Sequence, residues 1–90
     1  MSFEWDENKR RSNIHKHGID FVLAARIFLN PVLEVPDVEE HGEARTVAIG
    51  HWGENCLVVV YTWHGKNRRI ISAWKADKND REAYYQSIYG

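Results

Sequence analysis

The sequence predicts an α+β fold, in which one small antiparallel sheet packs against helices that precede and follow it in the chain. Two apolar runs, residues 56–63 and 68–76, flank a short polar insert that contains Gly65, which is the pattern of a β-hairpin. Apolar residues at helical spacing occur before and after the strand-forming region. A chain of 90 residues has room for one modest core, so we expect a single domain.

The N-terminal part of the chain predicts an edge strand and a helix. Residues 3–5 alternate like a short strand, and a helix is expected over residues 7–17. Asp6 supplies a side-chain oxygen as the helix N-cap, and Gly18 ends the helix. Because Ile14 is the only aliphatic residue of this helix, an apolar stripe cannot be its main support.

The same helix is rich in cations, and Lys9, Asn13 and Lys16 share one face by their spacing. Two interpretations of this face are open. It is either a solvated surface or a contact surface for phosphate groups.

A second helix and a strand follow. Asp20 caps a helix predicted over residues 21–30, whose apolar residues recur at core spacing. Residues 32–35 predict a short strand that Pro36 ends. Residues 37–43 contain four acids, and we expect them to form a polar loop that is the least ordered part of the chain.

The last part of the chain predicts the rest of the sheet and a terminal helix. Residues 44–52 alternate as a strand, residues 53–55 turn the chain, and residues 56–63 are apolar on both faces, as in a central strand. Cys56 lies in this run and is expected to be a reduced, buried thiol. Asp77 caps the final helix.

Charge is distributed unevenly, although the net charge is only −1. Residues 1–30 hold five Lys or Arg against four acids, residues 31–55 hold one against six, and residues 56–90 hold six against three. The two ends of the chain can therefore build a basic face, which is the electrostatic footprint of a phosphate-backbone partner. No apolar segment approaches the roughly 20 residues that span a bilayer, so we expect a cytoplasmic protein without membrane contact.

Several chemistries lack their sequence signatures. The five histidines have no thiol or carboxylate partners at ligand spacing, so neither a metal site nor a cofactor is predicted. The sequence has no glycine-rich phosphate loop and no Gly-x-Ser-x-Gly turn. These observations argue against metal catalysis, nucleotide hydrolysis and acyl transfer.

The remaining candidates for a functional site are cationic and aromatic side chains. Metal-free cleavage of RNA needs a base for the 2′-hydroxyl, cations for the charge that develops on phosphorus, and an acid for the 5′-oxygen. The chain has residues for each role, although isolated cations on helices and strands also commonly pair with nearby acids. The candidates are Lys9, Lys16, His17, Arg45, Arg69, Trp74, Lys75 and Tyr84.

Several segments of the chain resemble the BrnT toxins of bacterial type II toxin-antitoxin modules. The matching residues are Phe-Glu-Trp-Asp at 3–6, Lys9, Asn13, Lys-His-Gly at 16–18, Phe21, Gly-Glu-Ala-Arg at 42–45 and Arg-Ile-Ile-Ser-Ala at 69–73. Because the resemblance extends over nearly the whole chain, we expect residues 1–90 to form one BrnT-like toxin domain. The resemblance implies a RelE-like fold, with a small antiparallel sheet, two N-terminal helices and a C-terminal helix.

The resemblance also implies a function, that of a metal-independent RNA endonuclease that inhibits translation. A cognate BrnA-like antitoxin, which also binds DNA, would hold the toxin inactive in a hetero-oligomer. By motif position, the family's basic residues correspond to Lys16, His17, Arg45 and Arg69. The residues expected to be catalytic are His17, Arg45, Arg69 and Tyr84, and those expected to bind RNA are Lys9, Lys16, Trp74 and Lys75.

One position departs from the family pattern. Where the family usually has a basic residue after Ser-Ala, this chain has Trp74, and the next cation, Lys75, points to the opposite face of a strand. Trp74 either stacks on an RNA base or marks a weakened toxin that serves as an antitoxin-binding module in operon repression. A DNA-binding domain acting alone is disfavoured, because no helix-turn-helix or ribbon-helix-helix pattern is visible.

Overall fold

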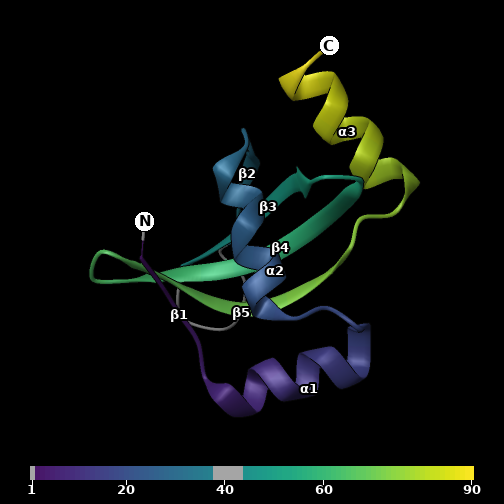
Figure 1. The fold of residues 1–90 in the computed structure, drawn as a ribbon. Coiled ribbons are helices and arrows are strands. Elements are labelled where there is room, and N and C mark those ends of the chain that lie inside the picture. The colour runs from purple at the N-terminus through teal and green to yellow at the C-terminus, as the bar shows by residue number, and fades with distance from the viewer. Residues whose placement is uncertain (1, 38–43) are drawn as a thin grey trace.

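The computed structural model describes residues 2–37 and 44–90, which form a five-stranded sheet with three α-helices and one 3₁₀ helix (Figure 1). The predicted α+β fold is confirmed. In chain order the elements are β1 (Ser2–Glu4), α1 (Glu7–His17), α2 (Phe21–Ala25), η1 (Arg26–Leu29), β2 (Leu33–Asp37), β3 (Arg45–Trp52), β4 (Asn55–His64), β5 (Asn67–Lys75) and α3 (Lys78–Ile88).

The strands lie in the order β1-β5-β4-β3-β2, so the apolar β4 is central, as the sequence predicts. Strands β2 to β5 pair antiparallel, whereas β1 pairs parallel to β5, with Glu4 beside Arg69. The sheet is therefore mixed and not wholly antiparallel. In Figure 1, α1 lies at the bottom of the view, below β5, and α3 lies at the top.

Each face of the sheet carries a core. One core joins α2 and η1 to the sheet, and the other joins α3 to it. The first contains Ile19, Phe21, Ala24, Ile27, Phe28, Ala48, Leu57, Val59, Tyr61, Ile70 and Ala73. The second contains Ile49, Cys56, Val58, Ala76 and Tyr84. Cys56 is buried and unbonded, and burial raises the pKa of its thiol, so the prediction of a reduced, buried cysteine is confirmed.

The caps predicted from the sequence are present in the structure. The Asp6 carboxylate accepts bonds from the backbone N–H of Asn8 and Lys9, and Gly18 ends α1 with a left-handed φ of 72°. Asp20 caps α2 in the same way, and Asp77 forms a capping box with Asp80 at the start of α3. The first turn of each α-helix is therefore fixed by a local side-chain interaction.

Most predicted boundaries lie within one residue of the observed ones, and two elements differ by more. The helix expected over residues 21–30 tightens into 3₁₀ geometry after Ala25, where the N–H of Arg26 also bonds the Leu23 carbonyl three residues back. The prediction that Pro36 ends the strand is wrong, since β2 continues through it to Asp37. An edge strand tolerates proline because one side of it needs no ladder partner. Residues 38–43 of the expected acidic loop lie outside the described residues.

The side chain of Asn13 holds α1 against β5. It is the only buried residue of α1, with 6% of its surface exposed. Its amide nitrogen donates to the carbonyls of Ile19 and Ala73, each at 2.8 Å. Its oxygen accepts from the N–H of Ala73 at 3.1 Å and from the Ser72 hydroxyl at 3.3 Å. A polar contact thus replaces the apolar stripe that α1 lacks, in agreement with the sequence.

We expect Asn13→Ala to destabilise the fold by about 2–4 kcal/mol, because the buried backbone groups of Ala73 and the Ile19 carbonyl would lose their partners. Urea denaturation measures the change. Ser12→Ala, at an exposed position of the same helix, is the matched control and should stay within about 0.5 kcal/mol of the wild type. Equal stability of Asn13→Ala and the wild type would contradict this role for the amide.

Candidate functional site

A groove of about 200 Å³ lies between α1 and β5. Asn13 clamps the helix there, and helical spacing directs Lys9 and Lys16 to the same side. Both lysines are exposed, and in the described part of the chain neither forms an ion pair. Two unneutralised ammonium groups beside a groove suit an anionic ligand. The lining residues are Lys9, Ser12, Asn13, Lys16, His17, Ile71 and Ser72.

His17 and Trp74 extend this groove toward the α3 side of the sheet. His17 is the last residue of α1 and is exposed, and its ring centroid lies 6.0 Å from that of Trp74. Trp74 is half-buried and packs against the core beneath α3. The indole therefore has a structural role, and only its remaining surface is available to a ligand.

Arg45 and Arg69 lie in one row across the sheet, with Thr62 between them. Arg69 of β5 pairs in register with Thr62 of β4. On the other side of β4, Thr46 pairs antiparallel with Tyr61, so the residue before it, Arg45, lies beside Thr62. Side chains in register share a face, and two strand spacings separate the arginine backbones by roughly 10 Å. We call Arg45, Thr62 and Arg69 the arginine row. The edge strands add an acid at each end of it, Glu4 next to Arg69 and Asp37 next to Arg45.

Glu4 binds three side chains from the β4–β5 hairpin. Its carboxylate accepts bonds from Arg69 Nη1 at 2.8 Å, from Asn67 Nδ2 at 2.9 Å and from His64 Nδ1 at 2.9 Å. The Asn67 and His64 hydrogen bonds, with the nearby positive charge, lower the pKa of Glu4 below its ordinary value. Glu4 is therefore ionised at neutral pH. We call Glu4, His64, Asn67 and Arg69 the hairpin cluster.

Sequence reasoning missed Glu4 and His64 as members of a site. Their positions, 60 residues apart, are brought together by the parallel pairing of β1 with β5. The available signal was a charged residue between Phe3 and Trp5 in a short alternating strand. Such a residue points away from the face on which its neighbours pack.

Two predicted site residues lie elsewhere. Tyr84 is fully buried in the core beneath α3, and its hydroxyl donates to the Pro31 carbonyl at 2.6 Å. Burial raises the pKa of this phenol, and Tyr84 does not line the groove between α1 and β5. Lys75 is exposed at the end of β5 and lines a separate hollow with Arg81 and Glu54.

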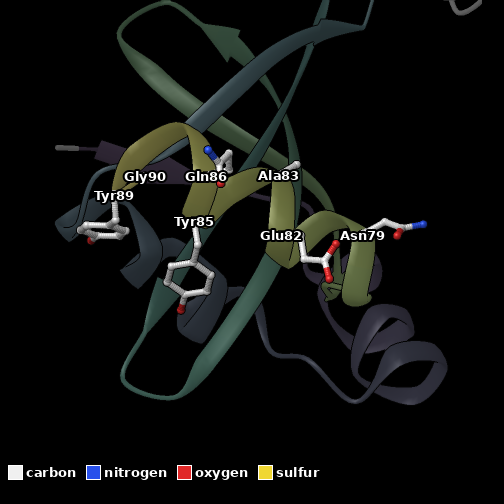
Figure 2. Close-up of a pocket in the computed structure, with 7 residues that line it drawn as sticks. All are labelled: Asn79, Glu82, Ala83, Tyr85, Gln86, Tyr89 and Gly90. Atoms are coloured by element: carbon white, nitrogen blue, oxygen red, sulfur yellow. The ribbon is translucent and has the colours of Figure 1, made fainter.

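A hollow of about 810 Å³ runs along α3 and is open to solvent (Figure 2). Tyr85 and Tyr89 are its exposed aromatic residues, and Tyr89 also contacts His51 Nε2 at 3.2 Å. None of the residues predicted for the site lines this hollow. Its lining residues are Asn79, Glu82, Ala83, Tyr85, Gln86, Tyr89 and Gly90.

Within residues 2–37 and 44–90, no three His, Cys, Asp or Glu side chains gather closely enough to hold a metal ion. No helix in this part of the chain has the length and apolar character needed to cross a membrane.

Comparison with solved structures defines the class of protein. The fold matches the crystal structure of the Brucella abortus ribonuclease toxin BrnT, with a TM-score of 0.71 and 33% sequence identity over 87% of this chain and 99% of that one. A family model described as "Ribonuclease toxin, BrnT, of type II toxin-antitoxin system" matches residues 5–80. The chain belongs to the BrnT family of ribonuclease toxins, which confirms the resemblance read from the sequence. No curated protein sequence matches it significantly.

The pKa of Glu4 leads to a pH-dependent prediction. Because the pKa lies below 4.5 in the folded state, the ionised carboxylate stabilises the fold above that value, and this contribution is lost as pH falls through the folded pKa. We expect Glu4→Gln to unfold more easily than the wild type at neutral pH, with a difference that shrinks below pH 4.5. Urea denaturation of both proteins across this range measures the difference.

Glu82→Gln is the control for that experiment. Among the described residues, the Glu82 carboxylate forms only an exposed pair with Lys78, at 3.9 Å, so its loss should change stability little at any pH. A gap between Glu4→Gln and the wild type that stays constant with pH would contradict the assigned contacts.

Proposed function

We propose that the chain is a metal-independent RNA endonuclease that inhibits translation, and that a cognate antitoxin neutralises it. The observation that carries this proposal is the pair Lys9 and Lys16, which have no ion pair among the described residues and lie at a groove whose strand, β5, also carries Arg69, in a chain of the BrnT family. Cations in these positions suit the phosphates of a single RNA strand.

We assign phosphate binding, base contact and charge stabilisation to different residues according to where they lie. Lys9 and Lys16 hold phosphates in the groove, and the exposed surface of His17 and Trp74 contacts a base. Arg69, with Arg45 on the same face of the sheet, stabilises the negative charge that develops on phosphorus during cleavage. Such a mechanism uses fixed cations and a proton acceptor and needs no bound metal.

The proposal extends to the partner and to the extent of the domain. A type II toxin family implies a cognate antitoxin, which we expect to be BrnA-like, to bind DNA and to form a hetero-oligomer with this chain. We propose residues 1–90 as one toxin domain that acts on RNA in the cytoplasm. The RNA sequence that is cut, and whether cleavage needs the ribosome, are properties of the RNA substrate. Sequencing of the cleaved RNA after expression of the toxin would define the cleavage sequence.

A second candidate function is that of a catalytically weak toxin that binds antitoxin in operon repression. Trp74 favours it, because a residue packed into the core beneath α3 stands where the family usually has a cation. Under this alternative the arginine row and the groove persist as remnants of an active site. The two functions differ in RNA cleavage and share antitoxin binding.

The first test concerns RNA binding. The double variant Lys9→Gln, Lys16→Gln should bind a 2′-O-methyl oligoribonucleotide more weakly. The slope of log affinity against log salt should fall by roughly 1.4, since each lost phosphate contact on a single strand contributes about 0.7. The double variant Arg11→Gln, Lys78→Gln, which removes the same charge outside the groove, is the control. Equal salt slopes for the two variants would contradict a phosphate-binding groove.

The second test concerns cleavage. The purified wild type should cleave RNA in the presence of EDTA, and Arg69→Ala should cleave on the order of 100-fold more slowly, because one fixed donor to the transition state is removed. Single-turnover kinetics on an oligoribonucleotide measure both rates. A wild type that binds antitoxin but leaves RNA intact, with cleavage gained in Trp74→Arg, would establish the second function instead of the first.

A further inference from the structure

The hairpin cluster contains a histidine that neither the sequence motifs nor the groove accounts for. His64 ends β4 and pairs in register with Asn67, the first residue of β5. Gly65, with a φ of 62°, makes the tight turn between them possible. The turn places the His64 ring beside Glu4 of β1, on the side of the hairpin that also holds Arg69.

The contacts of Glu4 fix which nitrogen of His64 carries the proton. A carboxylate only accepts hydrogen bonds, so His64 Nδ1, at 2.9 Å from Glu4 Oε2, is the protonated nitrogen of the neutral ring. The lone pair is then on Nε2. The His64 side chain is 69% exposed, so this lone pair is accessible to a ligand.

The same carboxylate oxygen also binds Arg69. Arg69 Nη1 lies 2.8 Å from Glu4 Oε2, and His64 Nδ1 lies 2.9 Å from the same oxygen. The two nitrogens are therefore at most about 6 Å apart. Asn67 holds the second carboxylate oxygen at 2.9 Å. A guanidinium has five N–H donors, and the Arg69 side chain is 43% exposed, which leaves donors for phosphate oxygens. An accessible base and a phosphate-binding cation are thus held at a fixed distance.

We propose that His64 is the catalytic base of RNA cleavage, and that Glu4 is the residue that positions it. This inference rests on the ribonuclease function proposed above. In the reaction, His64 Nε2 takes the proton of the 2′-hydroxyl, and the 2′-oxygen forms a bond to phosphorus. The bond from phosphorus to the 5′-oxygen breaks, and that oxygen takes a proton from water. The hydroxide that remains accepts the proton from His64.

The products of this step are a 2′,3′-cyclic phosphate and a 5′-hydroxyl, and no oxidant, reductant or metal takes part. Arg69 binds the nonbridging oxygens as charge develops on them. Glu4 keeps the ring in its reactive tautomer and stabilises the imidazolium that forms, as the aspartate carboxylate does for the histidine of a Ser-His-Asp triad.

His64 suits this role better than His17. The His17 ring contacts Trp74, and no described carboxylate orients it. The hairpin cluster is also close enough to the groove to share one RNA strand with it. Arg69 and Ser72 are three residues apart on β5, a distance of roughly 10 Å. One strand of RNA can therefore contact the groove lysines and present a 2′-hydroxyl to His64.

The experiment measures single-turnover cleavage of an oligoribonucleotide as a function of pH. His64→Gln should cleave at least about 100-fold more slowly than the wild type, the usual contribution of a general base, and should lose the acid limb of the pH–rate profile. Its affinity for 2′-O-methyl RNA should be unchanged. His15→Gln, at an exposed position of α1 outside the groove, is the matched control and should cleave like the wild type.

Glu4→Gln separates positioning from folding. The Glu4 carboxylate contacts His64 directly and also binds Asn67 and Arg69 of β5. Loss of the carboxylate should lower the single-turnover rate constant while affinity for 2′-O-methyl RNA stays unchanged, because the His64 ring loses the partner that orients it. A merely structural role would lower the folded fraction, seen by circular dichroism, and the amplitude of cleavage in proportion, without lowering the rate constant of the folded protein.

The outcomes distinguish the two proposals. Cleavage by His64→Gln at the wild-type rate, with an unchanged acid limb, would overturn the role of His64 and leave the ribonuclease function standing. Absence of cleavage by the wild type would overturn the ribonuclease function and the role of His64 with it. A 5′-phosphate product in place of the 5′-hydroxyl would also overturn the proposed step.

Discussion

The side-chain amide of Asn13 makes hydrogen bonds to the edge of β5 of the kind that a neighbouring strand would make. β1 ends at Glu4, beside Arg69, so the rest of the β5 edge has no strand partner in the described structure. Asn13 accepts the N–H of Ala73 and donates to its carbonyl, which reproduces one rung of a β-ladder with a side chain. Because α1 has little apolar surface, its position depends on this contact, and so does the groove.

The charges of α1 divide into two groups around that contact. Arg10 pairs with Glu7 at 2.6 Å and with Asp20 at 3.1 Å, so this cation belongs to the structure. Lys9 and Lys16 face the groove and have no such partners among the described residues. Arg10 therefore stabilises the fold, whereas the groove lysines have charge available to an external anion.

Local signals in the sequence were sufficient for most of the fold, and nonlocal pairing explains what they missed. Asp6, Asp20 and Asp77 predict helix starts because a cap depends on residues one turn away. The parallel pairing of β1 with β5 joins residues more than 60 positions apart, and no local pattern encodes it. Lys9 and Lys16 were therefore found together by helical spacing, whereas the contact of Glu4 with His64 required the tertiary structure.

The position of Trp74 has a different meaning once the two parts of the candidate site are separated. The indole packs on the core beneath α3 and against His17, so a cation at this position would have to leave the core to reach a phosphate. In the mechanism that we propose, the base lies at the β4–β5 hairpin, so Trp74 in place of a cation leaves the proposed base and Arg69 unchanged and alters the surface proposed to hold RNA. We therefore expect Trp74 to alter which RNA is bound and how tightly, and cleavage to depend on the hairpin cluster.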